Sequence, residues 1–339
     1  MSSRIVCFGE LLLRLGAPGR ERLLQSPRLE VCVGGAEANV AVSLARFGHA
    51  SAQVSVLPPG PLGDAAAGEL RRYGVDTSGL RTGPGRMGLY FLATGAGLRP
   101  SEVLYDRAGS AFALAEPGAY DWPRLLAGAT WLHLSGVSPA LGAAAAQATL
   151  DAARAARALG VQVSFDGNYR AKLWEAWNGD APGLLRQVMA EADLVFADHR
   201  DIGLVLGLPF AQDSAEAQVD AAAAAAFAAF PRLQRLATTL RTQHSVDHHA
   251  LSARLLVRGG GPFAAGPRDL PGIVDRIGGG DAFAAGVLHG LLTGQDEGAS
   301  LQFGLAAACL KHAQPGDAHL ASVADVEAML QEQGFHVRR

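Results

Sequence analysis

Three consecutive glycines followed by an aspartate are the residues of this chain whose types and spacing are best suited to chemistry. Gly278, Gly279, Gly280 and Asp281 stand within residues 275–286 (DRIGGGDAFAAG), and apolar residues resume at helical spacing directly after them. Glycines at a helix start let backbone N–H groups approach an anion, and the helix dipole favours negative charge there. An aspartate in the first turn can face an incoming nucleophile and accept its proton. A flexible loop that ends in an N-cap aspartate is the alternative interpretation.

Two common nucleotide-binding motifs are absent from the sequence. No Gly-x-x-x-x-Gly-Lys-Ser/Thr segment occurs, so a P-loop is excluded. No Gly-x-Gly-x-x-Gly segment follows the first predicted strand, which disfavours a dinucleotide-binding dehydrogenase.

Length and composition limit the class of protein. The 339 residues are 49% hydrophobic and 18% charged, so a large core can be buried and global disorder is not expected. With 29 basic and 32 acidic residues the net charge is −3, and no dense basic patch indicates nucleic acid as a partner. The apolar run at residues 5–15 is interrupted by Gly9, Glu10 and Arg14 and is too short to span a bilayer. We therefore expect a cytoplasmic protein that binds neither nucleic acid nor membrane.

Alternating strands and helices must position these residues. The sequence predicts strands at residues 4–8, 52–56, 130–134, 161–165 and 194–197, and helices at residues 37–47, 64–73, 143–159, 182–192, 220–230, 280–292, 299–312 and 323–333. Such alternation indicates parallel βαβ units and a sheet covered on both faces. Short strand pairs near residues 11–33 and 88–107 do not fit the alternation, and we interpret them as a small second sheet that acts as a lid. The predicted fold class is α/β with a small β appendage.

Two motifs resemble the signatures of the PfkB (ribokinase-like) carbohydrate kinases. Residues 275–281 (DRIGGGD) look like the C-terminal signature of that family, and residues 34–41 (GGAEANVA) look like its N-terminal signature. They lie about 240 positions apart in the expected order, and the resemblance extends over nearly the whole chain.

The resemblance implies a central, mainly parallel sheet flanked by helices on both faces, with a β-sheet lid. It also implies a single ribokinase-like kinase domain over residues 1–339, with lid strands within about residues 11–33 and 88–107. Free edges of the lid strands favour a homo-oligomer formed through the lid.

Within the family, the chain most resembles the 2-dehydro-3-deoxygluconate kinases. The likeness is carried by residues 88–92 (GLYFL), 105–110 (YDRAGS), 134–141 (LSGVSPAL), 166–170 (DGNYR) and 237–241 (ATTLR). It implies ATP-dependent phosphorylation of the 6-hydroxyl of 2-dehydro-3-deoxy-D-gluconate. Asp281 would be the general base, and N–H groups around Gly278 to Gly280 would stabilise the transferred phosphoryl group. A kinase for fructose or another neutral sugar and a non-catalytic sugar or nucleotide sensor are the alternatives, and the epimer of the acid stays open.

A sugar acid carries a carboxylate, and the planar fork of arginine binds carboxylates through two parallel N–H bonds. Arg107 follows a predicted lid strand, and Arg170 follows a predicted core strand in the loop where α/β enzymes bind ligands. The resemblance implies that the substrate contacts are Gly34, Gly35, Tyr90, Tyr105, Arg107, Arg170, Asp281 and Asp317. Taken singly, the arginines could pair with surface carboxylates, and the tyrosines suit strand positions regardless of function.

For the nucleotide, the resemblance implies ATP contacts from Asn168, Arg170, Thr239, Arg241, Gly278 and Gly280, with residues 239–241 in a loop at a strand end. Phosphoryl transfer also needs Mg²⁺ to neutralise the phosphates. Family members usually carry an Asn-x-x-Glu motif where this chain has Asp198-His-Arg-Asp201. Asp198 and Asp201 are therefore candidate metal ligands, and a solvated surface turn is the alternative.

Three histidines lie close together, at positions 244, 248 and 249. The residues between His244 and His248 offer neither a glutamate nor the spacing of a zinc site. We therefore expect an exposed loop here.

Overall fold

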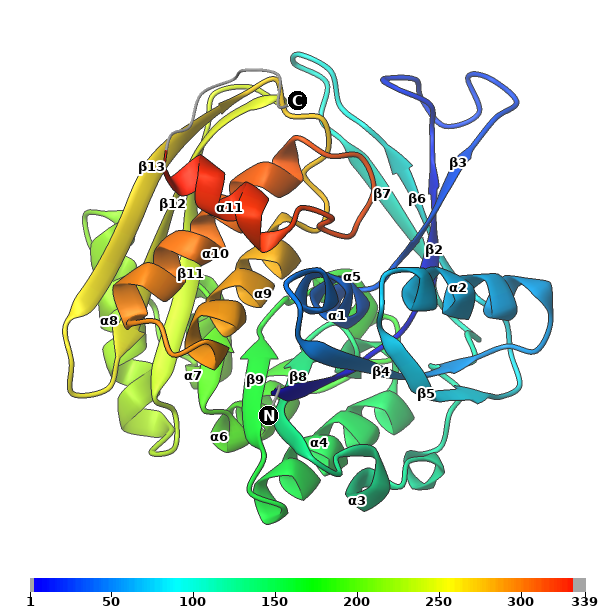
Figure 1. The fold of residues 1–339 in the computed structure, drawn as a ribbon, viewed down its shortest axis with the longest axis horizontal. Coiled ribbons are helices and arrows are strands. Elements are labelled where there is room, and N and C mark those ends of the chain that lie inside the picture. Colours follow the sequence, from blue (N-terminus) through cyan, green and yellow to red (C-terminus); the bar gives the residue numbers. More distant parts are fainter. Residues whose placement is uncertain (1–2, 332–339) are drawn as a thin grey trace.

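A nine-stranded sheet forms the centre of the computed structural model, which describes residues 3–331 (Figure 1). Its strand order is β13-β12-β11-β10-β9-β8-β1-β4-β5, and neighbouring strands are parallel from β5 as far as β11. The pairs β11–β12 and β12–β13 are antiparallel. The strands are β1 (Arg4–Phe8), β4 (Ala50–Leu57), β5 (Asp76–Thr82), β8 (Ala129–Ser135), β9 (Gln162–Asp166), β10 (Leu194–Phe196), β11 (Arg235–Gln243), β12 (His248–Val257) and β13 (Pro262–Pro271).

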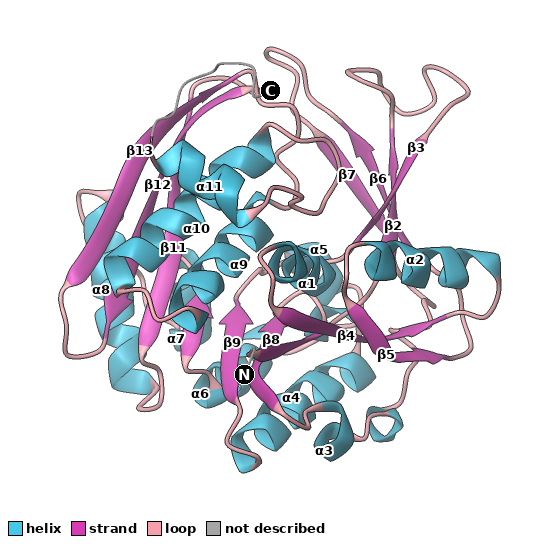
Figure 2. Cartoon of the chain, viewed as in Figure 1, coloured by secondary structure: helices cyan, strands magenta, loops and turns pink. Residues whose placement is uncertain are grey.

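Helices cover both faces of this sheet, as the alternation of elements predicts (Figure 2). One face carries α4 (Ala143–Ala158), α6 (Ala181–Glu191), α7 (His199–Leu206) and α8 (Ala215–Ala229). The other carries α1 (Ala36–Arg46), α2 (Pro61–Arg72), α9 (Gly279–Leu292), α10 (Glu297–His312) and α11 (Val323–Leu330). The shorter helices are η1 (Pro117–Ala119), α3 (Trp122–Leu125), η2 (Pro139–Leu141) and α5 (Ala171–Glu175).

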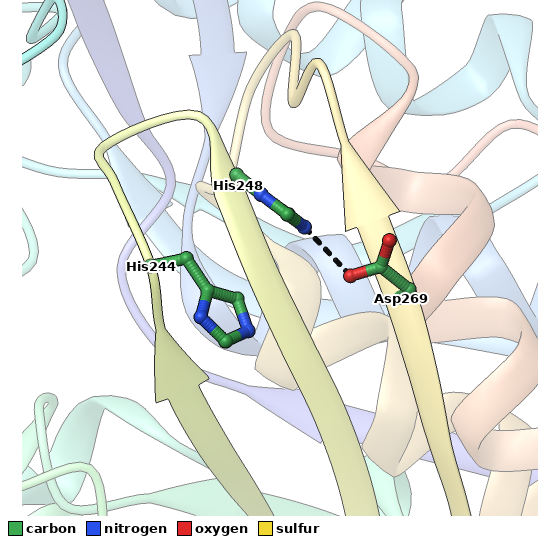
Figure 3. Close-up of side chains that lie close together, drawn as sticks. All are labelled: His244, His248 and Asp269. Atoms are coloured by element: carbon green, nitrogen blue, oxygen red, sulfur yellow. Dashed lines mark hydrogen bonds and ion pairs between the residues drawn. The ribbon is translucent and has the colours of Figure 1, made fainter.

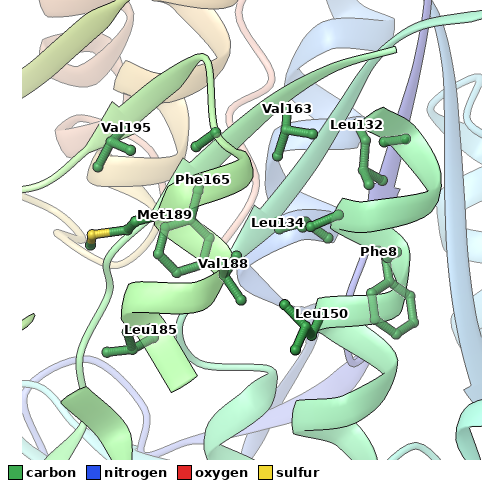
Figure 4. Close-up of a cluster of buried hydrophobic side chains, with 14 of the residues drawn as sticks. Phe8, Leu132, Leu134, Leu150, Val163, Phe165, Leu185, Val188, Met189 and Val195 are labelled. Carbon is green, nitrogen blue, oxygen red and sulfur yellow. The ribbon is translucent and has the colours of Figure 1, made fainter. Parts of the chain in front are cut away.

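Two hydrophobic cores result, one on each side of the sheet. Successive residues of a strand point to opposite faces, so in β1 Val6 and Phe8 enter one core while Ile5 and Cys7 enter the other. Figure 4 shows the first core, where Phe165 of β9 packs among aliphatic side chains from neighbouring strands and helices. Burial on both faces explains why the central strands are nearly continuous apolar runs.

A separate four-stranded sheet, in the order β3-β2-β6-β7, confirms the predicted lid. Its strands are β2 (Leu12–Gly16), β3 (Glu30–Gly34), β6 (Gly88–Ala93) and β7 (Glu102–Asp106). The outer pairs are antiparallel and the central pair β2–β6 is parallel. The fold is thus the predicted α/β fold with a mainly parallel sheet and a β-sheet lid.

The C-terminal part of the large sheet differs from expectation. Residues 239–241 lie within β11 and not in a loop at its end, and His248 and His249 begin β12. Only residues 244–247 form the turn between the two strands. Strand β5 was also not predicted, because its sequence DTSGLRT lacks an apolar run. The predicted end of the last helix, at residues 332–333, lies outside the described residues. No helix among residues 3–331 combines the length and apolarity needed to cross a membrane.

Candidate active site

Two adjoining cavities lie at the carboxyl ends of the central strands. The larger, of about 720 Å³, is lined mainly by the segments that follow β9 and β10, by the start of α8 and by β11. The smaller, of about 420 Å³, is lined by the lid, the start of α1 and the glycine triplet. Both are lined by Asp166, Asn168, Arg170, Arg241 and Gly280. Two ligands bound in these cavities would therefore meet at Gly280.

Asp281 lies in the first turn of α9 and lines the smaller cavity. The side-chain amide of Asn39, on α1, donates a hydrogen bond of 2.7 Å to its Oδ2 atom. Removal from bulk water raises the pKa of Asp281 to about 7, and the nearby charges of Asp317 and Glu37 act in the same direction. A carboxylate with a pKa near 7 is suited to accept a proton at neutral pH.

The three glycines before Asp281 have different reasons to lack a side chain. Gly278 is the N-cap of α9 with φ 79°, and a Cβ atom on it would strike the carbonyl oxygen of Asp317. A Cβ atom on Gly279 would lie 2.7 Å from the ring of His312. A Cβ atom on Gly280 would meet no atom within 4 Å. The first two glycines are therefore needed for packing, whereas Gly280 faces the open region between the cavities.

The amide hydrogens of this segment are not all available to a ligand. The N–H group of Gly279 donates to the carbonyl of Arg276 at 3.3 Å, so it is not free as the sequence interpretation assumed. The amides of Gly280 and Asp281 belong to the first turn, where N–H groups have no partner inside the helix. They are the donors that can face an anion at the junction of the cavities.

Positive charge gathers around both cavities. Arg170 and Arg241 line both of them and Arg276 lines the smaller one. Within residues 3–331, none of these three arginines forms an ion pair with a carboxylate. The alternative interpretation of Arg170, as the partner of a surface carboxylate, is therefore wrong. Desolvation and the nearby charge of Arg276 lower the pKa of Arg241. Converging cations that have no carboxylate partner favour the binding of anions.

Arg107 lines the smaller cavity but is already paired. Its Nε atom donates to Glu10, and both side chains are buried, with 5% and 1% of their surface exposed. The expected contact of Arg107 with a substrate carboxylate stays a prediction, and the ion pair with Glu10 limits how it can be made. Only the remaining N–H groups of its guanidinium can face the cavity.

A buried network of charges connects the lid to the segments before α9 and after α10. The Tyr90 hydroxyl, on β6, donates to Asp317 Oδ2 at 2.7 Å. Arg14, on β2, lies 2.7 Å from Asp275 Oδ2 and 3.0 Å from Asp317 Oδ1. Tyr90 and Asp317 both line the smaller cavity, but they are also bonded to each other. Tyr105 lines the same cavity with its ring centroid 6.3 Å from that of Tyr90.

The two glycines of the N-terminal motif line different cavities. Gly35 lines the smaller cavity with φ 148°, and a Cβ atom there would strike the carbonyl of Glu10. A Cβ atom on Gly34 would strike the Asp317 carboxylate, and Gly34 lines a neighbouring cavity of about 470 Å³. The predicted close approach of backbone to a ligand is thus possible at Gly35.

Asp198 and Asp201 form a capping box at the start of α7. Asp198 accepts from the Arg200 side chain and from two backbone amides, while Asp201 accepts from the Asp198 amide. Burial and the charge of Asp198 raise the pKa of Asp201 to about 6. The alternative interpretation of this segment as a solvated surface turn is therefore wrong, because both carboxylates cap the N-terminus of α7. They also line the larger cavity, together with Thr239.

Asp166, Asn39, Arg14 and Arg276 were missed as site residues. Asp166 ends β9 and lines both cavities, and burial together with Asp281 and Asp201 raises its pKa. Such mutually repelling oxygen ligands suit a hard divalent cation such as Mg²⁺. The sequence does indicate a role for Asp166, because this residue directly follows the predicted strand 161–165, at the edge of the sheet where α/β enzymes bind ligands. Asn168, two residues later, has φ 37°, a conformation rare outside glycine.

Comparisons with known proteins identify the family of the chain. A profile of the pfkB family carbohydrate kinases matches residues 2–323. The 2-dehydro-3-deoxygalactonokinase of Haloferax volcanii is 32% identical over 332 residues, which is 97% of each chain. The 2-dehydro-3-deoxygluconokinase of Bacillus subtilis is 28% identical over 92% of this chain and 90% of that one. The crystal structure of 2-dehydro-3-deoxygluconokinase from Thermotoga maritima is 38% identical with a TM-score of 0.90, and the match covers 97% of this chain and 99% of that one. The chain therefore belongs to the pfkB family of carbohydrate kinases.

Proposed function

We propose that this kinase transfers the γ-phosphoryl group of ATP to the 6-hydroxyl of 2-dehydro-3-deoxy-D-gluconate. Relatives named for this acid and for its galactonate epimer span nearly the whole chain, which supports a keto-deoxy sugar acid as substrate. The two cavities, of about 720 and 420 Å³, are large enough for a nucleotide and a six-carbon acid.

The observation that carries the proposal is the position of Asp281 beside Gly280. The carboxylate lines the sugar cavity, and the adjacent glycine lines both cavities. Asp281 accepts the proton of the substrate hydroxyl as its oxygen forms a bond to the γ-phosphorus and the bond to the ADP oxygen breaks. The amides of Gly280 and Asp281 stabilise the negative charge on the transferred group.

The arginines that form no ion pair among residues 3–331 support an acidic substrate. ATP brings negative phosphates to the junction of the cavities, and the sugar acid adds a carboxylate in the smaller one. Arg170 and Arg276 can bind these groups through charge-assisted hydrogen bonds. Asn168, Thr239 and Arg241 line the larger cavity, and we assign them to the nucleotide.

Asp166 and Asp201 are the residues that would hold Mg²⁺. The carboxylate of Asp198 is already engaged as the N-cap of α7 and as the acceptor of a hydrogen bond from the Arg200 side chain. When bound, the ion supplies positive charge that neutralises the phosphate oxygens.

The lid supports two further parts of the proposal. Its strands β6 and β7 place Tyr90 and Tyr105 over the smaller cavity, so closure excludes water that would otherwise compete as acceptor. The edge strands β3 and β7 leave Val31 and Leu104 exposed at 60% and 57%, which favours a homo-oligomer formed through the lid.

An ADP-release assay tests the proposed substrate. The purified protein is given ATP, Mg²⁺ and, separately, 2-dehydro-3-deoxygluconate, its galactonate epimer, fructose or ribose. We expect the highest kcat/KM with the gluconate-derived acid, and mass spectrometry should place the phosphate on its C6 oxygen. A higher kcat/KM with a neutral sugar would refute the acid assignment, and a higher value with the galactonate epimer would reassign the substrate.

A further inference from the structure

Two histidines and an aspartate meet on one face of the last three strands of the large sheet. Figure 3 shows His244 beside His248, with Asp269 on the next strand. The Nε2 atom of His248 and the Oδ1 atom of Asp269 are 2.7 Å apart, and the two imidazole rings have centroids 4.7 Å apart. One ligand atom from each of the three residues lies within 4.8 Å of the other two.

The register of the strands brings these residues together. In the β11–β12 pair Gln243 lies opposite His249, so the next positions outward, His244 and His248, also face each other. Asp269 lies opposite Ala250, which is two residues from His248 and therefore on the same face. Directly opposite and diagonal neighbours on one face are the positions whose side chains can touch. The residues between the two histidines do not indicate this cluster, because its third member, Asp269, comes from strand β13.

We propose that His244, His248 and Asp269 form a binding site for a divalent transition metal of the Zn²⁺ class. Two imidazole nitrogens and one carboxylate oxygen are ligands that Zn²⁺ prefers, and they leave coordination positions for water. Bonds of about 2.0–2.1 Å place tetrahedral ligand atoms about 3.4 Å apart. Small side-chain rotations bring the three atoms to this separation, because His244 and Asp269 are exposed.

The hydrogen bonds around the cluster favour a bound cation. Among the described residues, the ring of His244 has no hydrogen-bond partner, so a metal would displace no existing bond there. The Asp269 carboxylate already orients His248 Nε2 toward the centre of the cluster. Metal binding at Nε2 removes the proton shared with Asp269. That proton moves to Nδ1 if the ring is neutral, and it leaves to solvent if the ring is protonated.

The site would fix the turn at residues 244–247 to the sheet. In that turn Asp247 lies 3.4 Å from Arg20, which in turn donates to the carbonyl of Gly95 in the lid. On the same sheet face, Thr242 and Ser252 line the larger cavity. A metal bound by the turn and by strands β12 and β13 would therefore stabilise the edge of the sheet between the lid and the nucleotide cavity.

Titration of the chelator-treated protein with ZnCl₂ in nucleotide-free buffer tests the proposal. We expect one strong site per chain by calorimetry, and a rise of a few degrees in Tm at a hundredfold excess of Zn²⁺ over its Kd. The variants H244A, H248A and D269N should each weaken binding by at least about tenfold, since even the loss of a residue that only supports a metal ligand has that effect. An anomalous-scattering map of Zn²⁺-soaked crystals should place the ion between the three side chains.

Two control variants separate this site from general attraction of cations. D247N removes an acidic group of the same turn, and H199A removes an imidazole on α7; both should bind Zn²⁺ as the wild type does. If the wild type binds no Zn²⁺, or if the three cluster variants bind it as well as the wild type, the proposal is wrong. Equal weakening by D247N and D269N would also refute it, because attraction by surface charge would then be enough.

Discussion

The side-chain amide of Asn39 donates a 2.7 Å hydrogen bond to Asp281, although the two residues lie 242 positions apart in the chain. Asn39 lies on α1, directly after the N-terminal glycines, and Asp281 lies in the first turn of α9. This contact joins the two motifs that resemble the family signatures. It holds one carboxylate oxygen in place and leaves the other, Oδ1, to accept a proton.

Asp281→Asn should lower kcat by about 10²–10⁴, the usual contribution of a general base. The substitution keeps the shape of the side chain but removes its ability to accept the proton. ATP affinity should change little, because the proposal assigns the phosphates to backbone amides and arginines. Steady-state ADP release measures kcat, and calorimetric titration with ATP measures the affinity for the nucleotide. Turnover close to that of the wild type would remove Asp281 from the role of base.

The pH profile should show the raised pKa of Asp281. The base works only when deprotonated, so kcat/KM should fall as the pH drops through about 7, the pKa to which burial raises this group. The Asn39 hydrogen bond stabilises the charged form and lowers this pKa. Asn39→Ala should therefore shift the acid limb to higher pH. Ser43→Ala is the matched control, since Ser43 lies one turn later on α1 and its hydroxyl donates to the Asn39 carbonyl and not to Asp281. An acid limb that stays in place in Asn39→Ala would contradict the role of this contact.

Local patterns in the sequence were enough for most of the fold. Helical periodicity and apolar strands predicted α1, α4, α9 and α10 to within two residues at each end, because burial of one face requires that spacing. Strands β12 and β13 were not predicted: β12 alternates half-buried with buried residues, and β13 is mostly exposed, with proline at both ends. Neither resembles the continuous apolar runs of the central strands.

Contacts between distant residues could not be predicted from one sequence. Glu10 pairs with Arg107 across 97 positions, and Arg14 reaches Asp275 across 261. Nothing in the local sequence of either residue specifies its partner, because the pairing depends on how the lid packs. The capping box at Asp198 and Asp201 is different, since an aspartate with an acidic residue three positions later is a recognisable helix start.

Arg170→Ala should weaken binding of the sugar acid, measured as a rise in its KM of roughly 10- to 100-fold for the loss of charge-assisted hydrogen bonds. Arg170 is the better residue to test because Arg107→Ala would leave Glu10 buried without a partner and cost about 3–5 kcal/mol of stability. Arg72→Ala, an exposed arginine on α2 paired with Glu69, is the control and should keep the wild-type KM. A rise in the KM for ATP alone would assign Arg170 to the phosphates only.

Gly280→Ala and Gly278→Ala should separate catalysis from folding. A methyl group on Gly280 meets no atom within 4 Å, and alanine has a higher helix propensity than glycine. The free energy of unfolding of Gly280→Ala should therefore equal that of the wild type or exceed it by up to about 1 kcal/mol. The methyl group would, however, face the junction of the two cavities, where the phosphoryl group must pass, so kcat should fall at least tenfold. Gly278→Ala should instead lower the free energy of unfolding by more than about 1 kcal/mol, because φ is 79° and the new Cβ atom would strike the Asp317 carbonyl. Urea unfolding and ADP release measure both quantities for both variants. If Gly280→Ala keeps the wild-type kcat, the transferred phosphoryl group does not pass close to this glycine, and the assignment of the junction as the reaction centre fails.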